Sequence, residues 1–170
     1  MIQDTFERYT ELFQRIRENS KNSFHGIQLE CISKLVFFGG VQRQLIPILE
    51  IRDAFDGNGK ALDKIKNSKK ELILNDEMQR ALEDYFKDLK SHCSSFINRT
   101  KPLFPNYRTV RKLRLHWMKF GRGYSQIKRD GKLYKEAEEQ RRYEERIRIR
   151  RDSDSENDHV DMICDIDDDD

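Results

Sequence analysis

The side chains best suited to bind a ligand gather between Arg99 and Arg129, where ten basic residues occur without a single acidic one. Guanidinium groups offer planar, bidentate donors to phosphate oxygens, and ammonium groups act as point charges. Binding of such groups to a polyanion releases counterions and therefore weakens with salt. We expect eight of these residues to contact the phosphate backbone of nucleic acid (DNA or RNA): Arg108, Arg111, Lys112, Arg114, Lys119, Arg122, Lys128 and Arg129.

Apolar residues within the same segment recur at helical spacing. At 100° per residue, Val110, Leu113, Trp117 and Phe120 fall on one face of a helix over residues 107–120, and most of the basic residues fall on the opposite face. The apolar stripe predicts a helix that packs on the rest of the protein and presents its cations to the outside. Trp117 is therefore expected mainly to anchor this helix in the core.

An acidic protein surface would suit the same cations. The chain would then be a helical protein-protein adaptor or regulatory subunit whose charges steer its association. Two features favour this alternative: the apolar excess over residues 41–51, and Tyr143 and Ile147 on an otherwise polar helix. Both hypotheses include other protein subunits as partners, and neither needs a small-molecule substrate.

The segment Asp56-Gly57-Asn58-Gly59 resembles the middle of a calcium-binding loop. In that register Ala54 would occupy the first ligand position and Ile65 the twelfth, although calcium needs carboxylates at both. The three cysteines form no pattern with metal-ligand spacing. We expect a turn at residues 56–59, no metal site and no cofactor.

Catalysis would require a base within reach of a nucleophile or a metal. The only suggestive neighbours are His92 and Cys93, and adjacent residues on a helix point about 100° apart. His116 flanks the apolar stripe and is expected to be a packing residue. Gly121-Arg122-Gly123 lacks the third glycine of a dinucleotide-binding loop. The sequence therefore predicts a protein that is not an enzyme.

Charge divides the chain into three parts. Residues 1–98 hold 15 basic and 15 acidic side chains, residues 99–151 hold 18 and 6, and residues 152–170 hold none and 10. This pattern is typical of a basic interaction segment followed by a solvating tail. The tail either competes with a polyanion for the basic segment or serves solubility alone, and both alternatives stay open.

Two serines in the acidic tail are candidate phosphorylation sites. Ser153 and Ser155 each have an acidic residue three positions downstream, a pattern that resembles the sites of acidophilic kinases. Phosphate there would add further negative charge. The N-terminus is charged and amphipathic rather than a secretion signal, and no apolar run approaches the roughly 18 residues of a membrane span. With unpatterned cysteines, these features favour a nuclear or cytoplasmic protein in a reducing compartment.

The spacing of apolar residues predicts an all-α protein. Hydrophobic residues make up 36% of the chain and charged residues 38%, and the hydrophobic ones are concentrated before Phe120. We expect a single helical, bundle-like domain over residues 1–120, a basic and charged helical extension over 121–151, and a disordered acidic tail over 152–170.

Within this plan, the predicted helices cover residues 4–19, 27–40, 62–74, 75–97, 107–120 and 133–151. The stretch from Val41 to Phe55 is apolar on nearly every side, so we expect it to be buried, with Pro47 kinking or starting a helix. Residues 124–135 are ambiguous because Asp130-Gly131 is a typical turn signal.

Overall fold

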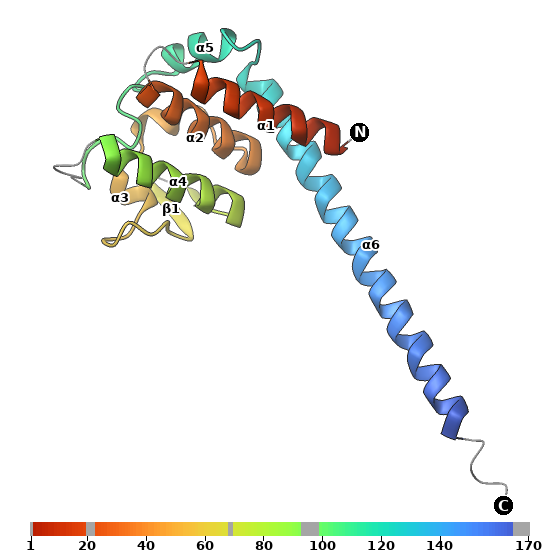
Figure 1. Cartoon of the computed structure of the whole chain (residues 1–170). Helices are drawn as coiled ribbons and strands as arrows, with labels where there is room; N and C mark the ends of the chain where they lie inside the picture. Colours follow the sequence, from red (N-terminus) through yellow and green to blue (C-terminus); the bar gives the residue numbers. More distant parts are fainter. Residues whose placement is uncertain (1, 20–22, 68–69, 93–98, 165–170) are drawn as a thin grey trace, which may run out of the picture. The chain divides into compact units, whose positions relative to one another are not determined.

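The structure is a computed structural model that describes residues 2–19, 23–67, 70–92 and 99–164, the last part beyond residue 155 by its backbone alone. It has the predicted all-α fold with one small two-stranded sheet (Figure 1). The chain divides into two units, a body of residues 1–134 and a C-terminal unit of residues 135–170. The helices are α1 (Ile2–Glu18), α2 (Ser23–Gly39), α3 (Ile51–Ala54), α4 (Asp76–His92), α5 (Val110–Met118) and α6 (Tyr124–Cys164), with the 3-10 helix η1 (Ile46–Ile48) before α3.

Helix α2 forms the centre of the body. It lacks a polar stripe, and its residues from Ile27 to Phe37 are buried except for Lys34. Helices α1 and α4 pack on either side of it through apolar stripes (Figure 1). The stripe of α1 contains Tyr9, Leu12, Phe13 and Ile16, and the stripe of α4 contains Met78, Leu82, Tyr85 and Leu89. These three helices confirm the expectations from helical spacing over the described residues.

The apolar stretch after α2 is largely buried, as predicted, but it is mostly not helical. Val41, Ile46, Leu49 and Ile51 each expose 5% of their surface or less. Pro47 lies in the short helix η1, where its missing N–H group leaves no helical hydrogen bond unmade. Most of the apolar side chains of residues 41–51, which favoured an adaptor surface, are therefore part of the core.

The predicted helix over residues 62–74 is wrong. An antiparallel pair of strands stands there instead, β1 (Lys64–Asn67) and β2 (Lys70–Ile73), in which Ile65 lies opposite Leu72. The run from residue 66 to residue 71 is entirely polar. A helix there would have had no apolar face to bury for more than one turn, whereas a hairpin needs to bury only Ile65 and Leu72.

The residues that precede α5 hold the basic segment on the body. Their backbone pairs with the backbone around the start of α3: Leu103 N–H donates to the Leu49 carbonyl at 2.8 Å, and Ile51 N–H donates to the Lys101 carbonyl at 3.1 Å. Thr109 caps the N-terminus of α5, because its side chain accepts a hydrogen bond from the N–H of Lys112. Helix α5 lies inside the predicted range 107–120.

Helix α6 begins directly after the two glycines that follow α5. Gly121 has a φ of +69°, a conformation that side chains with a Cβ adopt only with strain, so it can end one helix and redirect the chain. The turn signal at Asp130-Gly131 does not produce a turn, because α6 runs through both residues. Gly131 instead lies where α6 crosses α2, against the backbone of Phe37.

The C-terminal unit consists of the remainder of α6. The predicted helix over residues 133–151 is present, with Tyr143 and Ile149 exposed by 55% and 56%. Helix α6 continues to Cys164, and residues 165–170 lie outside the described range, so the expected disorder of the tail stays a prediction. In this helix Asp152 and Asp154 follow Arg148 and Arg150 at a spacing of four residues, which allows favourable charge pairs on the helix surface.

Candidate functional site

Helix α5 is anchored to α2 by its single tryptophan. Trp117 exposes 1% of its surface, and its indole Nε1–H donates a hydrogen bond of 2.8 Å to the Ser33 hydroxyl. That hydroxyl in turn donates to the carbonyl of Leu29 at 2.6 Å. Leu113 is also buried, so the predicted apolar stripe is the buried face of α5. Because the buried indole must face Ser33 to make this hydrogen bond, the contact sets the rotation of α5 about its axis.

The rotation of α5 turns its basic residues outward. Arg108, Arg111, Arg114 and Lys119 are exposed, and Lys112 is half-buried. Among the described residues, none of these five side chains takes part in an ion pair. Two cations from other segments, Arg43 from the loop after α2 and Lys128 from α6, lie close to the ring of Tyr124, which stacks on Trp117 of α5. We call these seven residues the basic surface: Arg43, Arg108, Arg111, Lys112, Arg114, Lys119 and Lys128.

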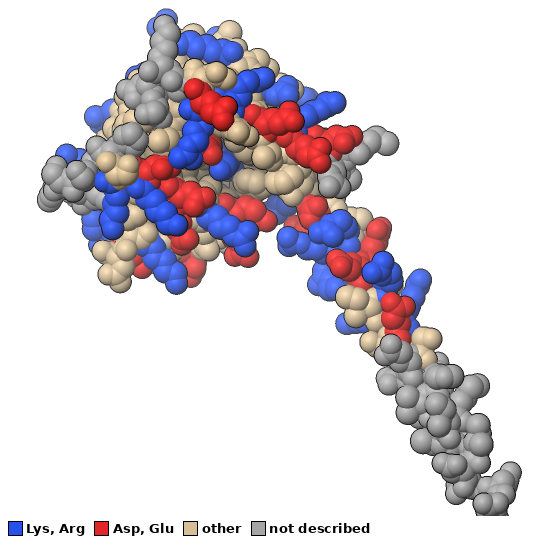
Figure 2. Space-filling view, in the orientation of Figure 1, with Lys and Arg blue, Asp and Glu red and all other residues tan. Residues whose placement is uncertain are grey.

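Figure 2 shows the charge distribution of one face of the body. Blue atoms are frequent at the end that carries α5, whereas blue and red atoms are mixed over α4 and the hairpin and red atoms follow α1. The excess of positive charge in the α5 region follows from the sequence, because residues 99–129 contain no acid. Positive charge of this kind, unneutralised by neighbouring carboxylates, attracts polyanions and raises their rate of association.

The side chain of Arg122 has another role in the structure. Its guanidinium carbon lies 5.7 Å from the centre of the Tyr9 ring, and its Nε is buried with no hydrogen-bond partner in the described part of the protein. Arg129 is exposed near the same tyrosine. The Tyr9 hydroxyl donates to Asp130 of α6, and burial followed by this hydrogen bond raises the pKa of Tyr9. These two arginines therefore lie near the contact between α1 and α6.

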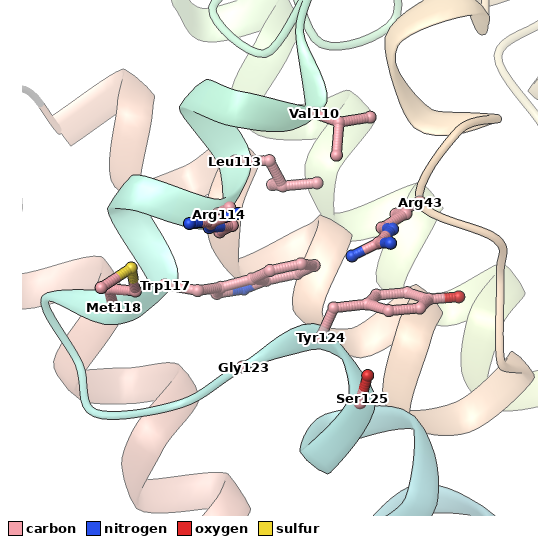
Figure 3. A pocket seen from close by; sticks show the side chains of 9 residues that line it. All are labelled: Arg43, Val110, Leu113, Arg114, Trp117, Met118, Gly123, Tyr124 and Ser125. Carbon is pink, nitrogen blue, oxygen red and sulfur yellow. The ribbon is translucent and has the colours of Figure 1, made fainter.

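A pocket of about 250 Å³ opens at the edge of α5 (Figure 3). One wall is formed by side chains of α5 and the other by the start of α6, with Arg43 reaching in from the loop after α2. The pocket is lined by Arg43, Val110, Leu113, Arg114, Trp117, Met118, Gly123, Tyr124 and Ser125. One of the predicted site residues, Arg114, lines this pocket, and a second, Lys128, lies close to Tyr124 without lining the pocket.

The ring of Tyr124 is held in this pocket by several contacts. Its hydroxyl donates to the carbonyl of Val41 at 2.9 Å, and its ring stacks on Trp117 with the centroids 6.1 Å apart. The guanidinium carbon of Arg43 lies 5.6 Å from the ring centroid, and Lys128 Nζ lies 5.9 Å from it. Cations at these distances are attracted to the negative face of an aromatic ring.

Two histidines lie on the opposite flank of α5. The Tyr107 hydroxyl and His116 Nδ1 are 2.8 Å apart, and the rings of His116 and His25 have centroids 6.1 Å apart. Burial lowers the pKa of both histidines, and the positive charge of Lys112 lowers each further. Both shifts favour the neutral imidazole, and the expected packing role of His116 fits its contacts.

Other candidate residues do not assemble into a site. Among the described residues, no three His, Cys, Asp or Glu side chains come together to hold a metal ion. The Asp56 carboxylate accepts hydrogen bonds from the N–H groups of Asn58 and Lys60, which closes the predicted turn and lowers the pKa of the carboxyl. Cys93 and the side chain of His92 lie outside the described part, whereas Ser153 and Ser155 are exposed on α6.

Comparisons with known proteins add no further assignment. No protein-family model, curated protein or solved structure matches the chain. Each helix in the described ranges is too short or too polar to span a membrane. Functional inference therefore rests on the basic surface and the pocket beside it.

The sequence pattern missed two residues of this site. Arg43 lies within an otherwise apolar stretch, but the polar triplet Gln42-Arg43-Gln44 was a signal that this part of the stretch is exposed. Ser125 had no such signal, because its place in the pocket depends on the glycine-containing connection between α5 and α6. Tyr124 is one of the aromatic residues interleaved with the basic ones, so stacking on a base could be considered for it from the sequence, although its helical spacing favoured the core.

Proposed function

We propose that this chain is a non-enzymatic, nucleic-acid-associated interaction protein, a subunit of a nuclear assembly, that contacts phosphates through the basic surface. One observation carries the proposal. Helix α5 is held in a single rotation by Leu113 and Trp117, so that cations without ion-pair partners in the described part of the chain face outward. A rigid helix that presents several such cations suits a phosphate backbone, whose charges repeat at short intervals.

Binding of this kind has a quantitative signature. Each phosphate contact releases counterions, so the slope of log affinity against log salt is about −0.7 per contact for single strands and about −0.9 for B-DNA. Removal of two contacting cations should reduce the slope by about 1.4 to 1.8. A cation that serves only solubility would leave the slope unchanged.

The experiment replaces Arg108 and Arg111 by glutamine and measures binding of fluorescently labelled oligonucleotides across a salt series. Both residues are exposed and lie outside the pocket lining, so the substitutions leave the core and the pocket intact. The matched control replaces Arg8 on α1 and Lys87 on α4, which are exposed and make the same change in net charge. We expect weaker binding and a smaller slope for the Arg108→Gln, Arg111→Gln variant alone. Equal effects in both variants would reject a localised binding surface.

The alternative function is a protein-protein adaptor that binds an acidic partner. It is favoured by Tyr143 and Ile149, two large side chains exposed in the C-terminal unit where no described residue covers them. Purification of the protein from a nuclease-treated lysate separates the two functions. A partner that remains bound after nuclease treatment, and is lost when both residues are replaced by glutamine, would favour the adaptor.

A further inference from the structure

The pocket beside α5 combines an aromatic ring with cations around its rim. Tyr124 is held by its hydroxyl bond to Val41, so its ring keeps one orientation. Arg43 and Lys128 lie within 6 Å of the ring centroid, and Arg114 lines the pocket from α5. A ligand for this pocket should therefore carry both a flat ring and negative charge.

The size of the pocket limits the flat group. Its volume of about 250 Å³ is below the roughly 300 to 1,000 Å³ of sites that enclose a drug-sized molecule. One heteroaromatic ring system of nucleobase size fits such a space. Val110, Leu113 and Met118 supply apolar walls, and the Ser125 hydroxyl supplies a hydrogen-bonding group at the pocket edge.

The position of Arg43 indicates how a base would be held. Its planar guanidinium lies over the Tyr124 ring, and its side chain is exposed and free of ion pairs in the described part of the protein. A planar base can take the place of the guanidinium on the ring face, since both stack on aromatic rings. The displaced guanidinium would then reach a phosphate beside that base.

Positive charge continues beyond the pocket in two directions. Arg111 precedes Arg114 by one helical turn on α5, and Lys128 follows Tyr124 by one turn on α6. A phosphodiester chain that leaves the pocket at either end therefore meets another cation. This arrangement suits a polymer with a phosphate at every unit better than an isolated small anion.

We infer that the pocket holds one unpaired nucleobase of a single-stranded nucleic acid, stacked on Tyr124, with Arg43 and Arg114 at the adjoining phosphates. The inference rests on the proposed function and names its partner class. Bases within a duplex are stacked on both faces and paired at their edges, so they cannot enter such a pocket without being unstacked. Single strands present their bases without this cost.

The test compares three probes at one salt concentration with the full chain. They are an oligodeoxythymidine of about 12 nucleotides, within the length that single-strand sites cover, an oligomer of the same length built from abasic units, and a duplex. The first two carry the same phosphates and differ only in their bases. We expect the oligodeoxythymidine to bind about fivefold or more tightly than the abasic strand, the lower limit for stacking of one base. Only the oligodeoxythymidine should change the emission of Trp117, the single tryptophan of the chain.

Variants test whether the difference in affinity between the oligodeoxythymidine and the abasic strand arises in the pocket. Tyr124→Leu should remove this difference, and Tyr124→Phe should keep it because the ring remains. Gly123→Leu should also remove it by filling the pocket: a Cβ at position 123 meets no atom within 4 Å, so the fold tolerates the change. Gly57→Leu is the control, since position 57 is exposed in a turn and the nearest atom to its Cβ is 3.9 Å away.

The outcomes separate the two proposals. Equal affinity for the oligodeoxythymidine and the abasic strand would overturn the nucleobase inference and leave phosphate binding intact. A base-dependent difference that Tyr124→Leu and Gly123→Leu both leave unchanged would also overturn it, because the base would then bind elsewhere. If none of the three probes binds, the proposed function itself is wrong.

Discussion

Gly131 of α6 lies against the main-chain carbonyl of Phe37 in α2, so closely that a Cβ at position 131 would collide with the carbonyl oxygen. Beside this crossing α6 also contacts α1: the Tyr9 hydroxyl donates to Asp130, and the Tyr134 ring stacks on Phe6 with the centroids 5.0 Å apart. These contacts fix the first part of α6 on the body. They thereby position Tyr124 beside α5, where the candidate pocket lies.

The first prediction concerns this crossing. Gly131→Ala should destabilise the body by up to about 2 kcal/mol, because overpacking costs about 1 to 3 kcal/mol while alanine gains roughly 1 kcal/mol over glycine in a helix. Chemical denaturation measures the free energy of unfolding. Gly57→Ala, at an exposed turn position with no close neighbour, is the control and should change it by less than about 0.5 kcal/mol. A Gly131→Ala protein more stable than the wild type would show that α6 does not approach α2 this closely.

The second prediction concerns the anchor of α5. Ser33→Ala should cost about 1 to 3 kcal/mol, because it leaves the buried indole N–H of Trp117 without an acceptor. The double variant Ser33→Ala, Trp117→Phe should cost less than the sum of the two single variants, since the phenylalanine has no donor to leave unpaired. Additive costs would mean that the two side chains are not hydrogen-bonded.

The third prediction is a pH dependence. The folded pKa values of His25 and His116 are lowered below the ordinary value of about 6.5, by burial first and by Lys112 and, for His116, Lys119. The folded protein then binds protons less readily than the unfolded chain, so this contribution to stability is present above pH 6.5 and is lost as the pH falls through the lowered values. Denaturation between pH 8 and 5 should show the loss.

The control for this pH dependence is the variant His25→Gln, His116→Gln, which keeps the remaining histidines. Its free energy of unfolding should depend less on pH in that window than that of the wild type. An unchanged pH dependence would assign the effect to other groups.

The fourth prediction concerns Arg122. Because its guanidinium packs over Tyr9 rather than facing solvent, Arg122→Gln should lower stability by about 0.5 to 2 kcal/mol through loss of the cation-π contact. It should change the salt slope of oligonucleotide binding less than Arg111→Gln does. Parallel thermal denaturation and salt titrations of the two variants test this, and a larger change in slope for Arg122→Gln would place its side chain at the phosphate contact.

Spacing along the chain was enough to predict most helices and the buried face of α5. Leu113 and Trp117 are four residues apart and return to the same side of a helix after about one turn, so local geometry alone indicated that both are buried. The outward position of Arg111 and Arg114 followed from the same periodicity. No knowledge of the packing partner was needed.

Features that depend on tertiary contacts could not be predicted in this way. Gly131 follows an aspartate and so matches a turn signal, but its position is explained by the backbone of Phe37 in another helix. Arg43 and Tyr124 come from separate parts of the chain and meet only because α6 crosses α2. Arg122 has the same local pattern as its basic neighbours, and only the contact with Tyr9 distinguishes it.

The most direct test of the central claim is to locate the nucleic acid on the folded protein. A photoreactive oligodeoxythymidine can be crosslinked to the full chain, and the attached peptides identified by mass spectrometry. We predict crosslinks within residues 107–128 and near Arg43, and their loss in the Arg108→Gln, Arg111→Gln variant. Crosslinks confined to α1 or α4, or equal crosslinking in wild type and variant, would contradict the assignment of the basic surface as the binding site.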